Sequence, residues 1–225
     1  NNKFAKWDSY FFYYAYLRNN SFLHVDSNQF LGIDHGSMQS GQFEIQDDSS
    51  RVWFTNNTTN ARCHLEFRNY YYDSVRDYDF VIEGNNFKGS GSEKLEFLGG
   101  SASKGKYLIK DNVIDSAAVY LSNIGKALVQ GNTIKNFTDS YDSALDVVNC
   151  NAVIENTTTT GNRGNGLKLN SYSGYSLIDT VRFNNITGNN TGNSSSKSGI
   201  NVYGYADYVI WYNDIYDNSE DYYDL

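Results

Sequence analysis

The chain has 225 residues, of which 40% are hydrophobic, and it carries a formal net charge of −8. This length allows one or two ordinary domains or one elongated repeat domain, and the acidic charge argues against nucleic acid and anionic membranes as partners. No apolar run approaches the roughly 18 residues of a membrane span. The chain starts without Met and Asn1–Lys3 does not begin a signal peptide, so we expect a mature or excised piece of something longer.

Residues 1–50 are expected to form an N-terminal cap with a few irregular strands. The aromatic run at 11–17 is typical of a strand or of a short capping helix, and it would cover the exposed core of the first turn of a repeat. Short strands are predicted at 22–25, 30–33 and 43–45, where apolar residues stand between turn residues.

A repeat extends from residue 51 to residue 218. Its mark is an Asn after a hydrophobic strand, followed two positions later by an apolar residue or Thr. The instances are Asn56, Asn85, Asn112, Asn132, Asn156, Asn184 and Asn213. Their spacing of 20–29 residues is typical of a solenoid with variable loops. We interpret these residues as a structural ladder, in which the amides hydrogen-bond along the stack and satisfy buried backbone groups.

A second strand recurs between these Asn residues. The side chains of this strand point alternately inward and outward, and one inward residue from each repeat contributes to a continuous apolar stack. The residues are Leu65, Leu95, Val119, Leu145, Leu167 and Ile200. We therefore predict an all-β, right-handed parallel β-helix of about seven or eight coils with an aromatic N-terminal cap, followed by an acidic aromatic tail at 219–225.

These strand pairs, corner Asn residues and coil lengths resemble the right-handed parallel β-helix of the pectin lyase-like superfamily, over about residues 51–218. Within it, Gly89–Glu96, Ala118–Ser122 and Val129–Ile134 resemble the central coils of polysaccharide lyases of the chondroitinase-B and alginate-lyase type. The place of the lyase Arg-His-Gly holds Ser122–Ile124, and no Asn-Lys-Ser follows the first of these segments. The paired-Asp and Gly-His-Gly pattern of polygalacturonases is also absent. The resemblance implies a polysaccharide-associated scaffold without the lyase Lys and Arg motifs.

The outward positions of the second strand give the candidate site, because long ligands lie across this face in the fold that the resemblance implies. Adjacent rungs place Glu66 and Glu96 roughly 5 Å apart, and Glu96 and Asp146 nearer 10 Å. These spacings bracket those of retaining and inverting glycosidases. The candidate catalytic residues are Glu96, Tyr120, Asp146 and Lys168. The candidate glycan-binding residues are His64, Glu66, Arg68, Asn201 and Tyr203. An exposed sheet face also requires polar residues for solvation alone, and this interpretation stays open.

Metal and thiol chemistry are only weakly indicated. Asp139, Asp142 and Asp146 supply carboxylates that a calcium ion prefers, although their spacing matches no known calcium loop. The three histidines show no metal-ligand spacing, so no other metal or cofactor is predicted. Cys63 and Cys150 fall three coils apart, roughly 14 Å, and are predicted to be free, mostly buried thiols.

Two functions remain open. The first is an extracellular or cell- or virion-surface protein without catalytic activity, which binds glycans or neighbouring subunits through its outward sheet face and forms a homo-oligomer or fibre. The alternative is a polysaccharide-degrading enzyme, a lyase or glycoside hydrolase, either cellular or tailspike-like. The missing lyase residues favour the first.

Overall fold

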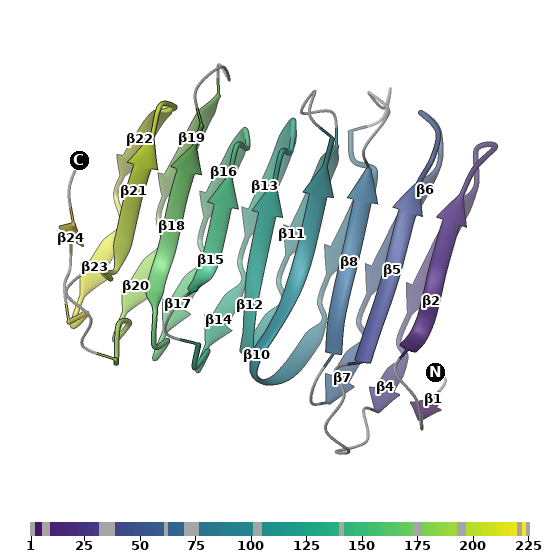
Figure 1. Cartoon of the computed structure of the whole chain (residues 1–225), viewed down its shortest axis with the longest axis horizontal. Helices are drawn as coiled ribbons and strands as arrows, with labels where there is room; N and C mark the ends of the chain where they lie inside the picture. The colour runs from purple at the N-terminus through teal and green to yellow at the C-terminus, as the bar shows by residue number, and fades with distance from the viewer. Residues whose placement is uncertain are drawn as a thin grey trace.

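A parallel β-helix accounts for the whole described chain. The computed structural model describes residues 3–5, 10–31, 39–60, 63–69, 77–100, 105–139, 142–172, 177–192, 197–219 and 222–223. These residues form strands and turns but no helix, and the strands stack side by side from the N-terminal to the C-terminal end of an elongated coil (Figure 1). Each turn contributes one strand to each of three sides, so residues about two dozen apart in the chain become neighbours.

The three sides divide the strands as follows. The first side holds β2 (Tyr10–Leu17), β5 (Gln39–Ile45), β8 (Cys63–Asn69), β10 (Asn86–Gly99), β12 (Val113–Ser122), β15 (Ser143–Val148), β18 (Asn165–Ser171), β21 (Ile200–Gly204) and β24 (Tyr222–Tyr223). The second side holds β3 (Phe22–Asp26), β6 (Arg51–Thr55), β9 (Phe80–Glu83), β11 (Lys106–Lys110), β13 (Lys126–Gln130), β16 (Ala152–Glu155), β19 (Ile178–Arg182) and β22 (Asp207–Trp211). The third side holds β1 (Lys3–Ala5), β4 (Gln29–Leu31), β7 (Thr58–Asn60), β14 (Thr133–Lys135), β17 (Thr158–Thr160), β20 (Asn185–Thr187) and β23 (Asp214–Tyr216). The long strands β10 and β12 also run along the third side and join it to the first in one 16-stranded sheet.

The predicted fold class is confirmed, with a small difference in the number of coils. The second side has eight strands, one for each rung. The first and the last rung each have only one neighbouring rung. About six turns are therefore stacked between two neighbours, whereas the sequence predicted seven or eight coils. The coil also begins before residue 51, because β2, β3 and β4 already pair in parallel with β5, β6 and β7. The aromatic run at 11–17 lies in strand β2, and the side chains up to Tyr14 lie outside the described residues.

The core is the predicted apolar stack, extended on all three sides by further inward residues. Leu95 pairs with Leu65 and with Val119, and the register continues through Leu145 and Leu167. None of these five residues is more than 3% exposed. Aromatic rings fill the N-terminal half of the interior, where Phe residues of successive rungs stack face to face with centroids 5.2 and 5.3 Å apart. This stacked apolar column is what holds short strands together that could not form a stable sheet alone.

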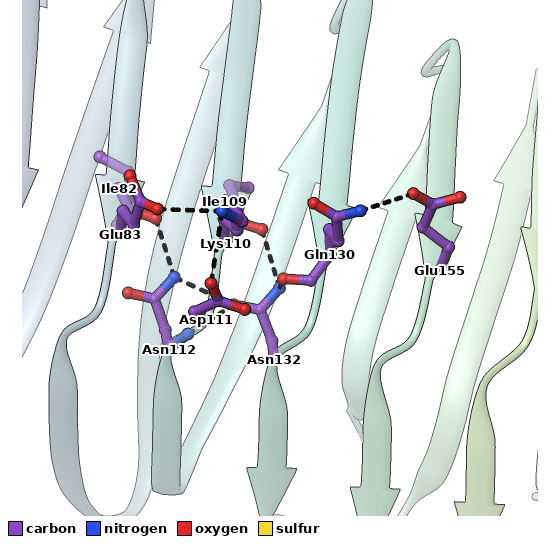
Figure 2. A network of polar contacts seen from close by, with 9 residues as sticks. All are labelled: Ile82, Glu83, Ile109, Lys110, Asp111, Asn112, Gln130, Asn132 and Glu155. Carbon is purple, nitrogen blue, oxygen red and sulfur yellow. Dashed lines mark hydrogen bonds and ion pairs between the residues drawn. The ribbon is translucent and has the colours of Figure 1, made fainter.

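A ladder of buried amides runs along the corner between the second and third sides. Asn112 donates its backbone N–H and its Nδ2 to Oδ1 of Asn132, at 3.0 and 2.9 Å, and Nδ2 also donates to the carbonyl oxygen of Ile82 at 2.9 Å (Figure 2). The same three bonds recur from rung to rung and satisfy backbone groups that the corner would otherwise leave unpaired. The residues that make all three bonds are Asn57, Asn85, Asn112 and Asn184. Asn28 makes the two bonds to Asn57, while its Nδ2 also donates to the Asp26 carbonyl oxygen, and Asn132 and Asn213 act as acceptors.

Two of the predicted ladder residues are wrong by one position. Asn56 and Asn156 are exposed, and the inward positions belong to the next residues, Asn57 and Thr157. Thr157 breaks the ladder in the middle of the coil, although its N–H still donates to Oδ1 of Asn184 at 2.9 Å. A second amide ladder, absent from the prediction, starts at the next corner and joins Asn162, Asn189 and Asn218.

The residue just before each ladder position adopts a positive φ, and this explains the one-position error. These corner residues are Ser27, Asn56, Gly84, Asp111, Gly131, Asn156, Phe183 and Tyr212, with φ between 51° and 67°. Asn, Asp and Gly tolerate this left-handed conformation best, so Asn occurs at the corner position as well as at the ladder position that follows it. Only the residue at the second of these two positions points inward. Phe183 and Tyr212 adopt the left-handed conformation against their bulk, and their exposed rings stack with centroids 5.7 Å apart.

Candidate functional site

The predicted outward column on the first side is formed in the expected register. Glu96 on β10 lies between Glu66 on β8 and Tyr120 on β12. Tyr120 is followed by Asp146 on β15, and the column continues through Lys168 on β18 to Asn201 on β21. Side chains two dozen residues apart therefore do line one face, but they are only partly exposed and interact mainly with one another.

At the N-terminal end of this column, an ion-paired group surrounds Glu66. His64 Nε2 lies 3.1 Å from Oε1 of Glu66 and 3.7 Å from Oε2 of Glu96 on the next rung. Arg68 pairs with the other oxygen of Glu66 through Nη2. The hydrogen bond with His64 and the charge of Arg68 together hold the pKa of Glu66 below its ordinary value, against the opposite effect of burial. Glu66 therefore stays ionised well into the acidic range and is a poor proton donor.

In the middle of the column, Tyr120 and Asp146 lie beside a small hollow. Burial raises the pKa of the Asp146 carboxyl, and the charge of Lys168, whose Nζ is 3.5 Å from Oδ2 of Asp146, opposes this shift. Burial also raises the pKa of Tyr120. The hollow measures about 40 Å³. One water molecule takes up about 30 Å³ in the liquid, so this space has room for a water but not for a sugar ring.

The remaining residues predicted for this face are spread along it. Arg68 is held in the ion pair with Glu66, Asn201 lies beside Lys168 on the next rung, and Tyr203 is 64% exposed in the last complete rung. The catalytic candidates Glu96, Tyr120, Asp146 and Lys168 thus share one ribbon of the sheet, and the hollow described beside Tyr120 and Asp146 is the one of about 40 Å³.

The three aspartates considered for calcium do not come together as a three-ligand group in the described part of the chain. Asp142 pairs with Nζ of Lys94 at 2.7 Å, and Asp146 faces Lys168. Each of these two carboxylates already has a lysine as its counter-ion, which lowers its affinity for a cation. Asp139 also has an interaction of its own.

The one group that the described residues bring within metal-binding distance consists of His64, Glu66 and Glu96. One ligand atom from each lies within 4.8 Å of the others. The sequence prediction placed all three residues on the outward face but assigned them to glycan binding or catalysis. The signal was a His-x-Glu on one strand with a Glu at the register position of the next strand.

A much larger hollow, of about 740 Å³, lies on the second side of the coil. We call it the Trp53 groove; it is lined by His24, Asp26, Trp53, Thr55, Asn56, Val81, Glu83, Gly84, Leu108 and Asp111. Its floor follows one outward column, in which Trp53 lies between His24 and Val81 and Val81 lies beside Leu108. A volume of this size is typical of small-molecule and cofactor sites.

Aromatic and cationic groups gather at the N-terminal end of the Trp53 groove. The ring of Trp53 meets Phe22 and His24 edge to face, with centroids 5.1 and 5.7 Å away. The guanidinium carbon of Arg51 lies 5.3 Å from the Trp53 ring centroid and 4.4 Å from that of Phe22. Such a cluster presents aromatic surface together with hydrogen-bond donors, a combination that suits amphipathic ligands.

A row of polar side chains runs beside the apolar floor and ends near the corner. Lys110 Nζ lies 3.2 Å from Oε1 of Glu83 and 3.4 Å from Oδ2 of Asp111 (Figure 2). Further along the same row, Gln130 Nε2 donates to Oε1 of Glu155 at 2.7 Å. These interactions fix the carboxylates of the rim in place, so they form a preorganised edge to the groove.

The sequence held a signal for the Trp53 groove that the prediction did not use. The strands of the second side are apolar at some outward as well as inward positions, as in Arg51–Thr55 and Lys106–Lys110. A strand exposed on one face needs apolar residues only on its inner face. The outward column of Trp53, Val81 and Leu108 therefore marks a surface that is more apolar than solvation requires.

Cys150 is a free, buried thiol, as predicted, and burial raises its pKa. The side chain of Cys63 lies outside the described residues.

The chain was compared with protein-family models, with curated proteins and with solved structures, and nothing matches it. The described residues also contain no helix that is both long and apolar enough to cross a membrane. The parallel β-helix itself is therefore the finding on classification, and every statement about activity has to come from the site.

Proposed function

We propose that this chain is a surface-exposed, extracellular β-helix protein that binds glycans through the outward sheet face of its second side without cleaving them. The observation that carries the proposal is the Trp53 groove, whose volume of about 740 Å³ contrasts with the hollow of about 40 Å³ at the predicted catalytic column. A pyranose ring needs an apolar surface for its C–H faces and hydrogen-bond partners for its hydroxyls. The groove offers both within one preformed depression.

The lining indicates the class of glycan. Asp26, Glu83 and Asp111 provide carboxylate acceptors at its rim, and its described lining residues include no Lys or Arg. Hydrogen bonds from Thr55 and Asn56 to Asp26 hold the pKa of that carboxyl at about 2, so it stays ionised at neutral pH. Lys110 offsets part of the charge of Glu83 and Asp111, so the repulsion of uronate-containing and sulfated chains comes from Asp26 and from the net charge of −8. We therefore expect a neutral or amino-substituted glycan.

The absence of cleavage is supported by the state of the candidate catalytic residues. Glu66 is held ionised by His64 and Arg68, and Asp146 faces the ammonium of Lys168. A general acid for glycoside hydrolysis needs a protonated carboxyl next to a bound sugar. Asp146 has the raised pKa but lies beside a space of about 40 Å³. On the first side, His64, Glu66 and Arg68 already interact with one another, so the glycan-binding role predicted for them with Asn201 and Tyr203 is not part of this proposal.

A binding panel tests the proposal. The protein is titrated calorimetrically with neutral, amino-substituted and anionic oligosaccharides, and the Trp53→Ala variant is compared with Trp211→Ala. Trp211 is 44% exposed in β22, at the opposite end of the same side, so its variant is a matched control. We expect binding of a neutral or amino-substituted glycan, lost with Trp53→Ala and retained with Trp211→Ala. Binding of anionic chains alone, or equal loss in both variants, would contradict the proposal.

The second candidate function is a polysaccharide-degrading enzyme of the pectin lyase-like superfamily, and a specific observation favours it. Asp146 combines a raised pKa with an Oδ1 that is buried and without a hydrogen-bond partner. An activity screen with reducing-end and unsaturated-product readouts tests this candidate. Any depolymerisation that disappears in Asp146→Ala would establish it and would overturn the non-catalytic proposal.

A further inference from the structure

We propose that His64, Glu66 and Glu96 form a binding site for a single zinc ion on the first side of the coil. The proposal is independent of glycan binding, because the Trp53 groove lies on the second side. It depends on the distances between the three ligand atoms, on the chemical nature of the ligands and on the way the neighbouring charges are held.

The distances match a tetrahedral ion. Zinc binds imidazole nitrogen and carboxylate oxygen at about 2.1 Å, which puts two ligands of a tetrahedron about 3.4 Å apart. His64 Nε2 lies 3.1 Å from Oε1 of Glu66 and 3.7 Å from Oε2 of Glu96, on either side of this value. All three ligand atoms lie within 4.8 Å of one another. The proposal requires the Glu96 carboxylate to move closer, so that the three atoms meet at one ion.

The ligand set favours zinc over calcium. Calcium prefers six to eight oxygen ligands, whereas an imidazole with two carboxylates suits zinc and similar divalent ions. Three protein ligands leave one position of a tetrahedron for water or for another ligand. The side chains of His64, Glu66 and Glu96 are 14%, 20% and 23% exposed, so the site is half-buried and still open to solvent on one side.

The surrounding structure holds the ligands in place. His64 and Glu66 project from the same strand, β8, and Glu96 projects from β10 at the register position of Glu66. Arg68 pairs with the second oxygen of Glu66 and fixes the orientation of that carboxylate. Residues that orient metal ligands in this way commonly change metal affinity by about 10- to 100-fold when they are replaced.

The nearest competing cation is drawn away from the site. Lys94 precedes Glu96 by two residues on β10, and its Nζ pairs with Oδ2 of Asp142 at 2.7 Å. The two carboxylates and the guanidinium of Arg68, which pairs with Glu66, together carry a net charge of about −1. This charge attracts a divalent cation.

The test is a calorimetric titration of EDTA-treated protein with zinc chloride, together with the visible spectrum after addition of Co²⁺. We expect one ion per chain, the intense visible bands of four-coordinate Co²⁺, and no competition by an equal concentration of Ca²⁺. Glu96→Gln and His64→Asn should each weaken zinc binding at least tenfold. His24→Asn on β3 is the matched control, because His24 is a surface histidine that belongs to no three-ligand group in the described residues.

Far-UV circular dichroism and the unfolding midpoint establish that each variant is folded before its affinity is compared. The proposal is overturned if wild-type protein binds no zinc at millimolar concentration, or if Ca²⁺ displaces zinc at equal concentration. It is also overturned if the folded Glu96→Gln and His64→Asn variants keep wild-type affinity, or if His24→Asn weakens binding as much as they do.

Discussion

Replacing Asn112 by Asp probes the amide ladder with the smallest possible change of shape. Asn112 is 1% exposed, and its Oδ1 accepts from the backbone N–H and Nδ2 of Asn85 at 3.0 and 2.9 Å. Asp keeps this acceptor. It loses the donor that serves the Ile82 carbonyl and Oδ1 of Asn132, both at 2.9 Å, and faces both with a second oxygen.

The magnitude follows from these two contacts. Each buried acceptor that loses its partner costs about 1–3 kcal/mol. The Ile82 carbonyl oxygen loses this donor, whereas Oδ1 of Asn132 keeps the bond from the Asn112 backbone N–H at 3.0 Å. One such loss, together with the repulsion between the new oxygen and both acceptors, gives a destabilisation of about 3 kcal/mol for Asn112→Asp at neutral pH. Burial and the two facing oxygens raise the pKa of the new carboxyl in the folded state, so the variant regains stability relative to wild type as the pH falls and the protonated group donates again.

The assay is urea unfolding followed by circular dichroism and by tryptophan fluorescence, since agreement between the two probes establishes a single transition. The matched control is Asn156→Asp, an exposed Asn with φ of 51° at the equivalent corner. We expect the control to change the free energy of unfolding by less than about 0.5 kcal/mol. Equal losses in both variants would refute the role assigned to the ladder.

Three further predictions concern buried groups. Burial raises the pKa of Asp179 to about 7, although the hydrogen bond that Asp179 accepts from the Ala152 N–H opposes this shift. The charged form therefore opposes folding, and the free energy of unfolding should fall by up to about 4 kcal/mol as the pH rises from about 4 to about 7. Asp179→Asn should remove this slope in pH-dependent denaturation, and an unchanged slope would assign it to other groups. Phe67 is fully buried between stacked rings 5.2 and 5.3 Å away, and Phe67→Ala should cost about 3–5 kcal/mol in the same unfolding assay, whereas a loss below about 1 kcal/mol would show that the ring stack contributes little. In a Cys63→Ser background, Cys150 should react with a thiol reagent only after unfolding, and rapid labelling of the folded chain would show that this corner opens.

The stacking of the first side could be predicted from the sequence because its signal is redundant. Leu95, Val119, Leu145 and Leu167 are each followed by a polar residue, and a shift of one residue would turn the whole strand outward. Because one face of each strand has to be buried, the register of the outward residues from Glu96 and Tyr120 to Lys168 follows directly. The ladder was less determined, because Asn56 and Asn57 both fit the motif, and in a later coil Asn156 fits it whereas the inward residue is Thr157. Only the left-handed conformation of the first member decides which side chain points inward.

The candidate sites were harder to predict, because they depend on how far side chains extend from a correct backbone. The alternation predicts that Tyr120 and Asp146 share a face, but it does not give the volume between them. Likewise, the Trp53 groove depends on the corner residues that rise beside the apolar floor. The proximity of His64 to both glutamates depends on side-chain rotamers, which no periodicity in the sequence specifies.

The central claim is that the Trp53 groove on the second side, and not the column of Glu96 and Asp146 on the first, receives the glycan. The most direct measurement is a residue-resolved NMR titration of the isotope-labelled protein with an oligosaccharide that binds it. The account predicts amide shift changes confined to β3, β6, β9 and β11 and to the corners beside them. Shift changes centred on β10, β12 and β15, with β3 and β6 unaffected, would contradict it.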